Sequence, residues 1–149
     1  IPPFIKRIAP YAFSESLIES IKIPFQIIEI GKCSFYMCKN LHKIEIPSNS
    51  QINSIGDRAF YMSSIESIYF PQKITQINFK SIFDYCSRLH LMEIDENCKI
   101  EKINKDDICF ESCNNLIVYV SKNIEMVNPD FDFIFSLNLA TCDFSSSSM

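Results

Sequence analysis

The sequence predicts a β-rich solenoid: a right-handed coil of five to six near-identical units with a parallel sheet and short helical or irregular turns. Three observations support this fold class. A pair of β-branched residues three positions apart recurs along the 149 residues, an aromatic residue follows most pairs, and a short alternating segment closes each unit. One such unit cannot bury its own apolar face, so successive units stack and share a core.

The β-branched pair predicts a short extended segment in every unit. It is followed by glycine or asparagine, the residues that most readily adopt positive φ. The copies are Ile27 and Ile30 before Gly31, Ile52 and Ile55 before Gly56, Ile74 and Ile77 before Asn78, Ile100 and Ile103 before Asn104, and Ile124 and Val127 before Asn128. We expect Gly31 and Gly56 to supply positive φ. The earlier pair, Ile5 and Ile8, precedes Ala9, which predicts a different turn there.

An aromatic residue and then a small residue follow each pair. The aromatic residues are Phe13, Phe35, Phe60, Phe83 and Phe110, and three positions after them stand Ser16, Cys38, Ser63, Cys86 and Cys113. These positions predict a short helix or irregular turn that fills the end of the coil, where a small, weakly polar side chain is needed.

A short strand closes each unit. In the second unit, Ile44 and Ile46 alternate with Lys43 and Glu45, the pattern of a half-buried strand, and Pro47 ends it because proline lacks an N–H for the ladder. The closing positions Pro24, Pro47, Pro71, Asp95 and Ser121 lie 23, 24, 24 and 26 residues apart.

This spacing predicts one domain over residues 1–142. Its units are roughly 5–24, 25–47, 48–71, 72–95 and 96–121, with 122–142 as a degenerate terminal coil. The Ser-rich residues 143–149 are expected to form a disordered tail.

The segment from Leu41 to Ser63, LHKIEIPSNSQINSIGDRAFYMS, resembles the BspA-like leucine-rich repeat family, whose units read approximately L-x-x-I-x-I-P-x-x-V-x-x-I-G-x-x-A-F-x-x-C. It departs by one extra residue in the turn and by Ser63 in place of cysteine. The resemblance extends from about Ile5 to Val127. It implies a leucine-rich repeat solenoid and a surface protein of bacteria or parasitic protozoa that acts as an adhesin toward host or matrix proteins.

Composition argues against several other functions. Fourteen Lys and Arg against eighteen Asp and Glu give a net charge of -4, the wrong sign for a nucleic-acid partner. Two glycines are too few for a phosphate-binding loop. No apolar stretch is long enough to predict a membrane span in this chain.

The cysteines and histidines do not suggest a catalytic or metal site. Seven cysteines, an odd number without paired spacing, do not predict a disulfide framework. Cys38, Cys86 and Cys113 are interpreted as small core residues, as in the family, although stacking also makes a disulfide between Cys86 and Cys113 conceivable. His42 and His90 are expected on the solvated rim, roughly 10 Å apart and thus too far apart to share an ion. We therefore predict no enzyme activity, metal or cofactor.

Parallel stacking should align equivalent outward residues in rows. One row is Lys22, Glu45, Tyr69, Glu93 and Tyr119, and its neighbour is Ser20, Lys43, Ser67, Leu91 and Ile117. The first two units contribute charges, and the later ones contribute aromatic and aliphatic side chains. The candidate protein-binding residues are Tyr69, Leu91, Glu93, Ile117, Tyr119, Glu45 and Lys43. Alternatively, the segment from Phe133 to Leu139 covers this apolar end.

The predicted function is a non-enzymatic protein-binding module, expected at the cell surface from the family resemblance. The alternative is an intracellular scaffold, which several free cysteines would suit. In both cases the partner is a protein of unknown identity, and open solenoid ends would permit self-association.

Overall fold

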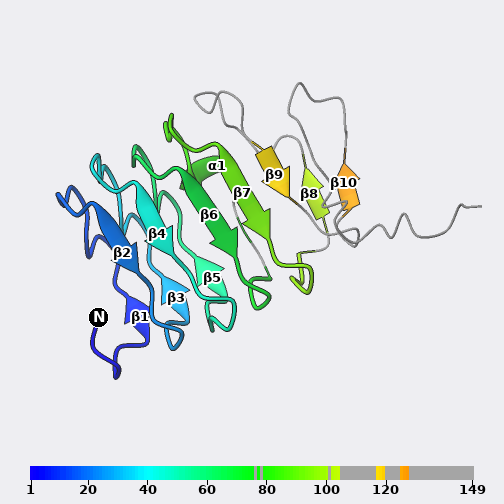
Figure 1. Ribbon diagram of the computed structural model, residues 1–149, viewed down its shortest axis with the longest axis horizontal. Helices are drawn as coiled ribbons and strands as arrows, with labels where there is room; N and C mark the ends of the chain where they lie inside the picture. The colour runs from blue at the N-terminus through cyan, green and yellow to red at the C-terminus, as the bar shows by residue number, and fades with distance from the viewer. Residues whose placement is uncertain (76, 78, 101, 105–116, 120–124, 128–149) are drawn as a thin grey trace, which may run out of the picture.

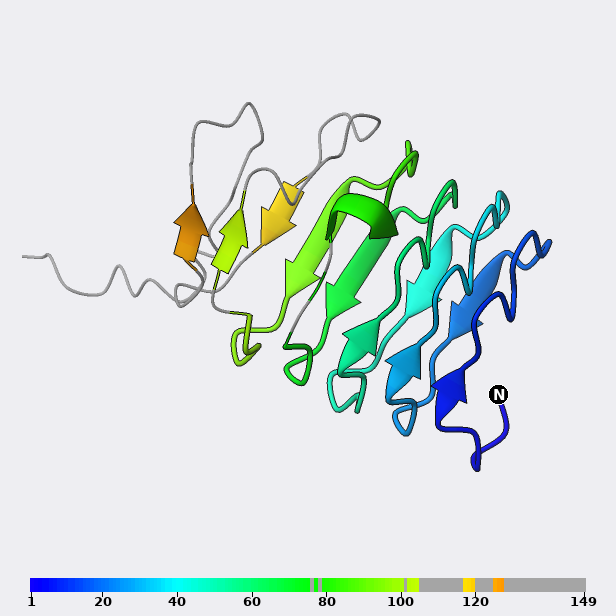
Figure 2. The ribbon, with the colours of Figure 1, turned by 180° about the vertical axis from the view of Figure 1, so that it is seen from behind.

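The computed structural model of the chain is a β-solenoid of stacked coils, as predicted (Figure 1). It describes residues 1–75, 77, 79–100, 102–104, 117–119 and 125–127. We call the units 5–24, 25–47, 48–71 and 72–95 coils 1 to 4. The later units are described only by residues 96–100 and by their strands. Two rows of parallel strands run along the molecule, and the view from behind shows the same succession of layers (Figure 2).

The closing segments of the units form the first row of strands. The strands are β2 (Ser20–Lys22), β4 (Lys43–Glu45), β6 (Ser67–Phe70), β7 (Leu91–Ile94) and β9 (Ile117–Tyr119). They pair in parallel as two ladders, β2-β4 and β6-β7-β9. Just before the strands, the N–H of Glu66 donates to the carbonyl of His42 at 3.1 Å, which joins the two ladders.

The β-branched pairs form the second row. Its strands are β1 (Arg7–Ile8), β3 (Glu29–Ile30), β5 (Ser54–Ile55), β8 (Lys102–Asn104) and β10 (Glu125–Val127). They pair in parallel as β1-β3-β5 and as β8-β10. Ile8, Ile30 and Ile55 occupy equivalent positions in register, so the predicted second extended segment is confirmed.

The core lies between the two rows of strands, and side chains from equivalent positions of successive coils fill it. In coil 2, Ile44 and Ile46 are buried while Lys43 and Glu45 are exposed, as the alternation predicted. The rings of Phe13, Phe35, Phe60 and Phe83 form a continuous stack with centroid distances of 5.2, 5.3 and 5.8 Å. The last three of these rings are fully buried.

The role predicted for the glycines is wrong. Neither Gly31 nor Gly56 has positive φ. A Cβ on Gly31 would lie 2.6 Å from the carbonyl oxygen of Ile8, and one on Gly56 would lie 2.7 Å from the Cα of Lys32. Glycine is therefore required because the backbone of the preceding coil passes directly beside it. Asn104, expected to share the positive φ, lies within strand β8.

Positive φ occurs instead at two later positions of the turn, and no glycine occupies them. The first position lies two residues after Ala9, Gly31 or Gly56, and the second lies two residues after the stacked phenylalanine. The residues are Tyr11, Cys33 and Arg58 at the first, and Glu15, Met37, Met62 and Tyr85 at the second, with φ between 53° and 62°.

An alternating hydrogen-bond pattern holds this turn. In coil 1, the N–H groups of Tyr11, Phe13 and Glu15 donate to the carbonyls of Lys32, Ser34 and Tyr36 in coil 2. The intervening N–H groups of Ala12, Ser14 and Ser16 donate back to carbonyls three residues earlier in coil 1. Coil 2 repeats the pattern toward coil 3. Coil 4 instead contains the helix α1 (Phe79–Ile82) in this segment.

Candidate protein-binding surface

The strand register aligns the outward residues in the predicted rows within each ladder. In the ladder β2-β4, Ser20 pairs with Lys43 and Lys22 with Glu45. In the ladder β6-β7-β9, Ser67, Leu91 and Ile117 form one row, and Tyr69, Glu93 and Tyr119 form the other. The prediction of rows is therefore confirmed for these strands.

The ladder β2-β4 carries a small cluster of paired charges. Lys43 contacts Glu45 at 2.8 Å, and Lys22 reaches the same carboxylate at 4.0 Å. The hydrogen bond from Lys43 lowers the pKa of Glu45. All three side chains are exposed, so solvent screens these ion pairs and they contribute little to stability.

The ladder β6-β7-β9 carries the aromatic and aliphatic residues of the surface. Glu93 is exposed, whereas Tyr69, Leu91, Ile117 and Tyr119 are half-buried. The prediction that these outward side chains form an exposed patch is therefore wrong in part, since all four are partly covered. The surface thus combines half-buried tyrosine and aliphatic side chains with one exposed carboxylate.

Tyr69 is held in a fixed position on this surface. Its ring packs against the core, and its hydroxyl donates a hydrogen bond to the carboxylate of Asp95 at the end of β7. Burial, and then this hydrogen bond, raise the pKa of Tyr69. Because Tyr69 is opposite Glu93 in register, its ring must lean along the strand direction to reach Asp95, two residues beyond Glu93.

The segment from Phe133 to Leu139, predicted as an alternative cover for this surface, lies outside the described residues. The choice between a binding surface and a covered end therefore stays a prediction.

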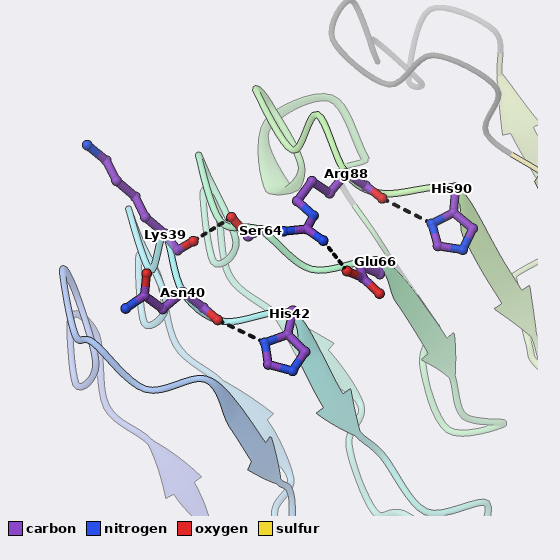
Figure 3. A network of polar contacts seen from close by, with 7 residues as sticks. All are labelled: Lys39, Asn40, His42, Ser64, Glu66, Arg88 and His90. Atoms are coloured by element: carbon purple, nitrogen blue, oxygen red, sulfur yellow. Dashed lines mark hydrogen bonds and ion pairs between the residues drawn. The ribbon is translucent and has the colours of Figure 1, made fainter.

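A polar network borders the sheet where the strands begin (Figure 3). Arg88 contacts the carboxylate of Glu66 at 2.6 Å. The Nδ1–H groups of His42 and His90 each donate to the carbonyl two residues earlier, at 3.1 Å. Both imidazoles are exposed, which confirms the predicted rim location.

Cys38 and Cys86, which stand three residues after the stacked phenylalanines Phe35 and Phe83, are buried in the core, as predicted. Each thiol donates to the carbonyl of the stacked phenylalanine in the preceding coil, Phe13 for Cys38 and Phe60 for Cys86, at 2.9 Å. Burial raises the pKa of Cys38, and it raises the pKa of Cys86 to about 11. Cys113, and with it the conceivable disulfide to Cys86, lies outside the described residues.

The described part of the chain shows neither a disulfide nor a group of three His, Cys, Asp or Glu side chains placed to hold a metal. Within the same residues, no helix has the length and apolar character to cross a bilayer.

A second column of aromatic rings, which was not predicted from the sequence, is formed by residues of the turns. The rings of Tyr36 and Tyr61 stack at 5.0 Å, and Tyr85 meets Tyr61 edge-on at 5.4 Å. The guanidinium of Arg58 lies 5.7 Å from the centre of the Tyr61 ring. The signal was present, because Tyr36 and Tyr61 directly follow the repeat phenylalanines.

Comparison with known proteins agrees with this architecture. The profile of the BspA type leucine rich repeat region matches residues 6–147 in six copies. The chain therefore belongs to the BspA-type leucine-rich repeat family.

Two solved structures share the fold. One is a leucine-rich repeat protein from Bacteroides ovatus ATCC 8483, 25% identical, with a TM-score of 0.57 over 80% of this chain and 38% of that one. The other is a leucine rich cell surface protein from Faecalibacterium prausnitzii A2-165, 17% identical, with a TM-score of 0.52 over 79% of this chain and 40% of that one. The chain thus spans about two fifths of the length of these relatives. No curated protein matches it.

Proposed function

We propose that the chain is a non-enzymatic protein-binding module whose binding surface is the outer face of the ladder β6-β7-β9. The family and the repeat architecture support a protein-interaction role, since stacked repeats present extended surfaces. The surface consists of Tyr69, Leu91, Glu93, Ile117 and Tyr119, with Lys43 and Glu45 on the neighbouring ladder as its charged border.

The observation that carries this proposal is the change of chemistry along rows that stay in register. On β2 and β4 the row holds Lys22 and Glu45, which neutralise each other, whereas on β6 and β9 it holds tyrosines. Tyrosine supplies a large contact area with only two side-chain torsions to fix, so it favours binding. The hydrogen bond of Tyr69 to Asp95 removes part of that remaining freedom before any partner arrives.

The finer proposal is an adhesin at the cell surface that binds a host or matrix protein. The solved relative from Faecalibacterium prausnitzii is described as a cell surface protein, and the family resemblance points the same way. Display on the cell exterior would place the sheet face in contact with such proteins.

The test is binding of the purified chain to immobilised matrix proteins and to cultured epithelial cells. We expect the double variant Tyr69→Ala/Tyr119→Ala to lose at least tenfold in affinity, because the two rings supply much of the accessible contact area. The matched control, Tyr36→Ala/Tyr61→Ala, removes two half-buried tyrosines of the turns, outside the proposed surface, and should bind within about threefold of the unaltered chain. Unchanged affinity of the tyrosine variant together with a lowered melting temperature would instead favour the covered-end alternative.

A second candidate function is an intracellular scaffold. The supporting observation is that Cys33, Cys38, Cys86 and Cys98 form no disulfide, as expected for a reducing compartment. Antibody labelling of intact and of permeabilised cells separates the two functions. Labelling without permeabilisation supports the adhesin, and labelling only after permeabilisation supports the scaffold.

A further inference from the structure

The row Tyr69, Glu93, Tyr119 places one carboxylate between two phenol rings. The strand register aligns the three residues on adjacent strands, which are about 4.8 Å apart in a parallel sheet. Leu91 and Ile117 form the parallel row beside them. Any partner that covers both rings must therefore also cover Glu93.

Covering an unpaired carboxylate is costly unless the partner supplies a charge of the opposite sign. Glu93 is exposed and makes no ion pair with the residues that the structure describes. Nearby, Arg88 is already paired with Glu66. A second carboxylate, that of Asp95 directly after β7, accepts the Tyr69 hydroxyl and the N–H of Asn97 and adds negative charge near Glu93.

The ladder β2-β4 shows the opposite arrangement. There the central carboxylate, Glu45, is neutralised by Lys22 and Lys43 of this chain. The equivalent position of β7 has tyrosines as its neighbours in the row, so the complementary cation is missing from the described residues. The two ladders thus differ in their source of positive charge, because β2-β4 carries its own cations whereas β6-β7-β9 shows none beside Glu93 among the described residues.

We propose that the partner inserts a cationic side chain, an arginine, between Tyr69 and Tyr119 and onto Glu93. This inference rests on the proposed function of the sheet face and specifies the chemistry of the partner. A guanidinium binds a carboxylate in a bidentate manner and also stacks on aromatic faces, whereas an ammonium group offers only a point charge. Within this chain, Arg58 already lies against Tyr61 in such a contact.

The experiment uses a defined probe in place of an unidentified protein. The probe is an extended pentapeptide, acetyl-Arg-Val-Arg-Val-Arg-amide, and its neutral counterpart carries citrulline at the three arginine positions. Binding is followed by the chemical shifts of the Leu91 and Ile117 methyl groups in the full chain. We expect the arginine peptide to bind at least tenfold more tightly than the citrulline peptide, with affinity falling as salt is raised from 50 to 300 mM.

Three variants decide the assignment. Glu93→Gln should reduce affinity for the arginine peptide to that of the citrulline peptide, and Tyr119→Leu should weaken it several-fold. Glu29→Gln is the matched control, and we expect its affinity to be unchanged because Glu29 lies on β3, outside the proposed surface, and is already paired with Arg7. None of the three side chains belongs to the buried core, so melting temperatures should stay close to that of the unaltered chain.

The outcomes separate this inference from the proposed function. Equal binding of the two peptides, or full binding by Glu93→Gln, would overturn the arginine assignment. If Tyr69→Ala/Tyr119→Ala still abolishes binding to a matrix protein while Glu93→Gln does not, the sheet face remains the binding surface and only the cationic anchor is wrong. If neither variant affects that binding, the sheet face itself is wrong.

Discussion

At single positions of the turn, glycine is required for a reason that the sequence alone does not reveal. Gly31 suits its site because the backbone of the preceding coil leaves no room for a Cβ, not because its φ is positive. The two explanations predict different results for asparagine, which tolerates positive φ but carries a Cβ.

We therefore expect Gly31→Asn to destabilise the chain as strongly as Gly31→Ala, by about 2 kcal/mol or more, since each forces adjacent backbones apart. Urea denaturation followed by circular dichroism measures the effect. Ala9→Gly is the control at the equivalent position of coil 1, with an expected cost of no more than about 1 kcal/mol. A Gly31→Asn variant as stable as the unaltered chain would restore the positive-φ explanation.

Glu15 is a residue at which the backbone conformation is unfavourable. Its φ is 58°, in the left-handed region, which costs a residue other than glycine or asparagine roughly 1–2 kcal/mol. We expect Glu15→Asn to raise the unfolding free energy by about 0.5–1 kcal/mol, because the N–H that bonds to Tyr36 is retained. Thermal denaturation measures the gain. Glu19→Asn removes the same charge where φ is not positive, and an equal gain there would show that the cause is charge.

Cys86 makes stability depend on alkaline pH. Its pKa is raised by burial from 9.0 to about 11, so the thiol stays protonated in the folded chain after it ionises in the unfolded chain. The resulting contribution to stability is complete below pH 9 and is lost as the pH rises toward 11. We expect the difference in unfolding free energy between the unaltered chain and Cys86→Ser to shrink by about 2 kcal/mol between pH 8 and 11. Other groups titrate in both proteins and cancel, so a constant difference would contradict the assignment.

Among the structural elements, the phenylalanine stack links the coils most directly. Phe60 is fully buried between the rings of Phe35 and Phe83, whereas Phe13 in coil 1 is half-buried and stacks on Phe35 alone among the described rings. Removal of a ring should therefore lower the free energy of unfolding more at Phe60, within the stack, than at Phe13, its first member.

We expect Phe60→Ala to lower the unfolding free energy by about 3–5 kcal/mol and Phe13→Ala by about half as much. Guanidinium denaturation of the two variants gives the comparison. Equal losses would mean that the coils do not stabilise one another through the aromatic stack.

The strands could be predicted from the sequence more completely than the turns. Alternation in IEIP determines which side chains face inward, and the 23- or 24-residue spacing aligns equivalent positions, so the rows through Lys43 and Tyr69 followed from counting. The turn could not be predicted in this way, because Tyr11, Glu15 and Met37 have no intrinsic preference for positive φ. Their conformation is stabilised by hydrogen bonds to the next coil, which local sequence does not reveal.

The candidate surface was likewise predictable only in part. The rows were predictable, but the half-burial of Tyr69 and its bond to Asp95 were not. That bond depends on the lean of the Tyr69 ring along the strand direction, past Glu93 to Asp95. The extent of the domain, 1–142, and the tail at 143–149 remain predictions, although the family match over residues 6–147 is compatible with a solenoid over most of the chain.

For the whole molecule, the turn hydrogen bonds give the stack a direction. The N–H groups at Tyr11, Phe13 and Glu15 all donate onward to coil 2, and none of the described N–H groups donates to the matching carbonyls of Pro10, Ala12 and Ser14 in coil 1. The outer edge of coil 1 at this turn is therefore an acceptor-only edge. Coils 1, 2 and 3 all donate at this turn to the coil that follows, so the coils stack with a single polarity, and a coil turned end for end would not match the donors and acceptors of its neighbours.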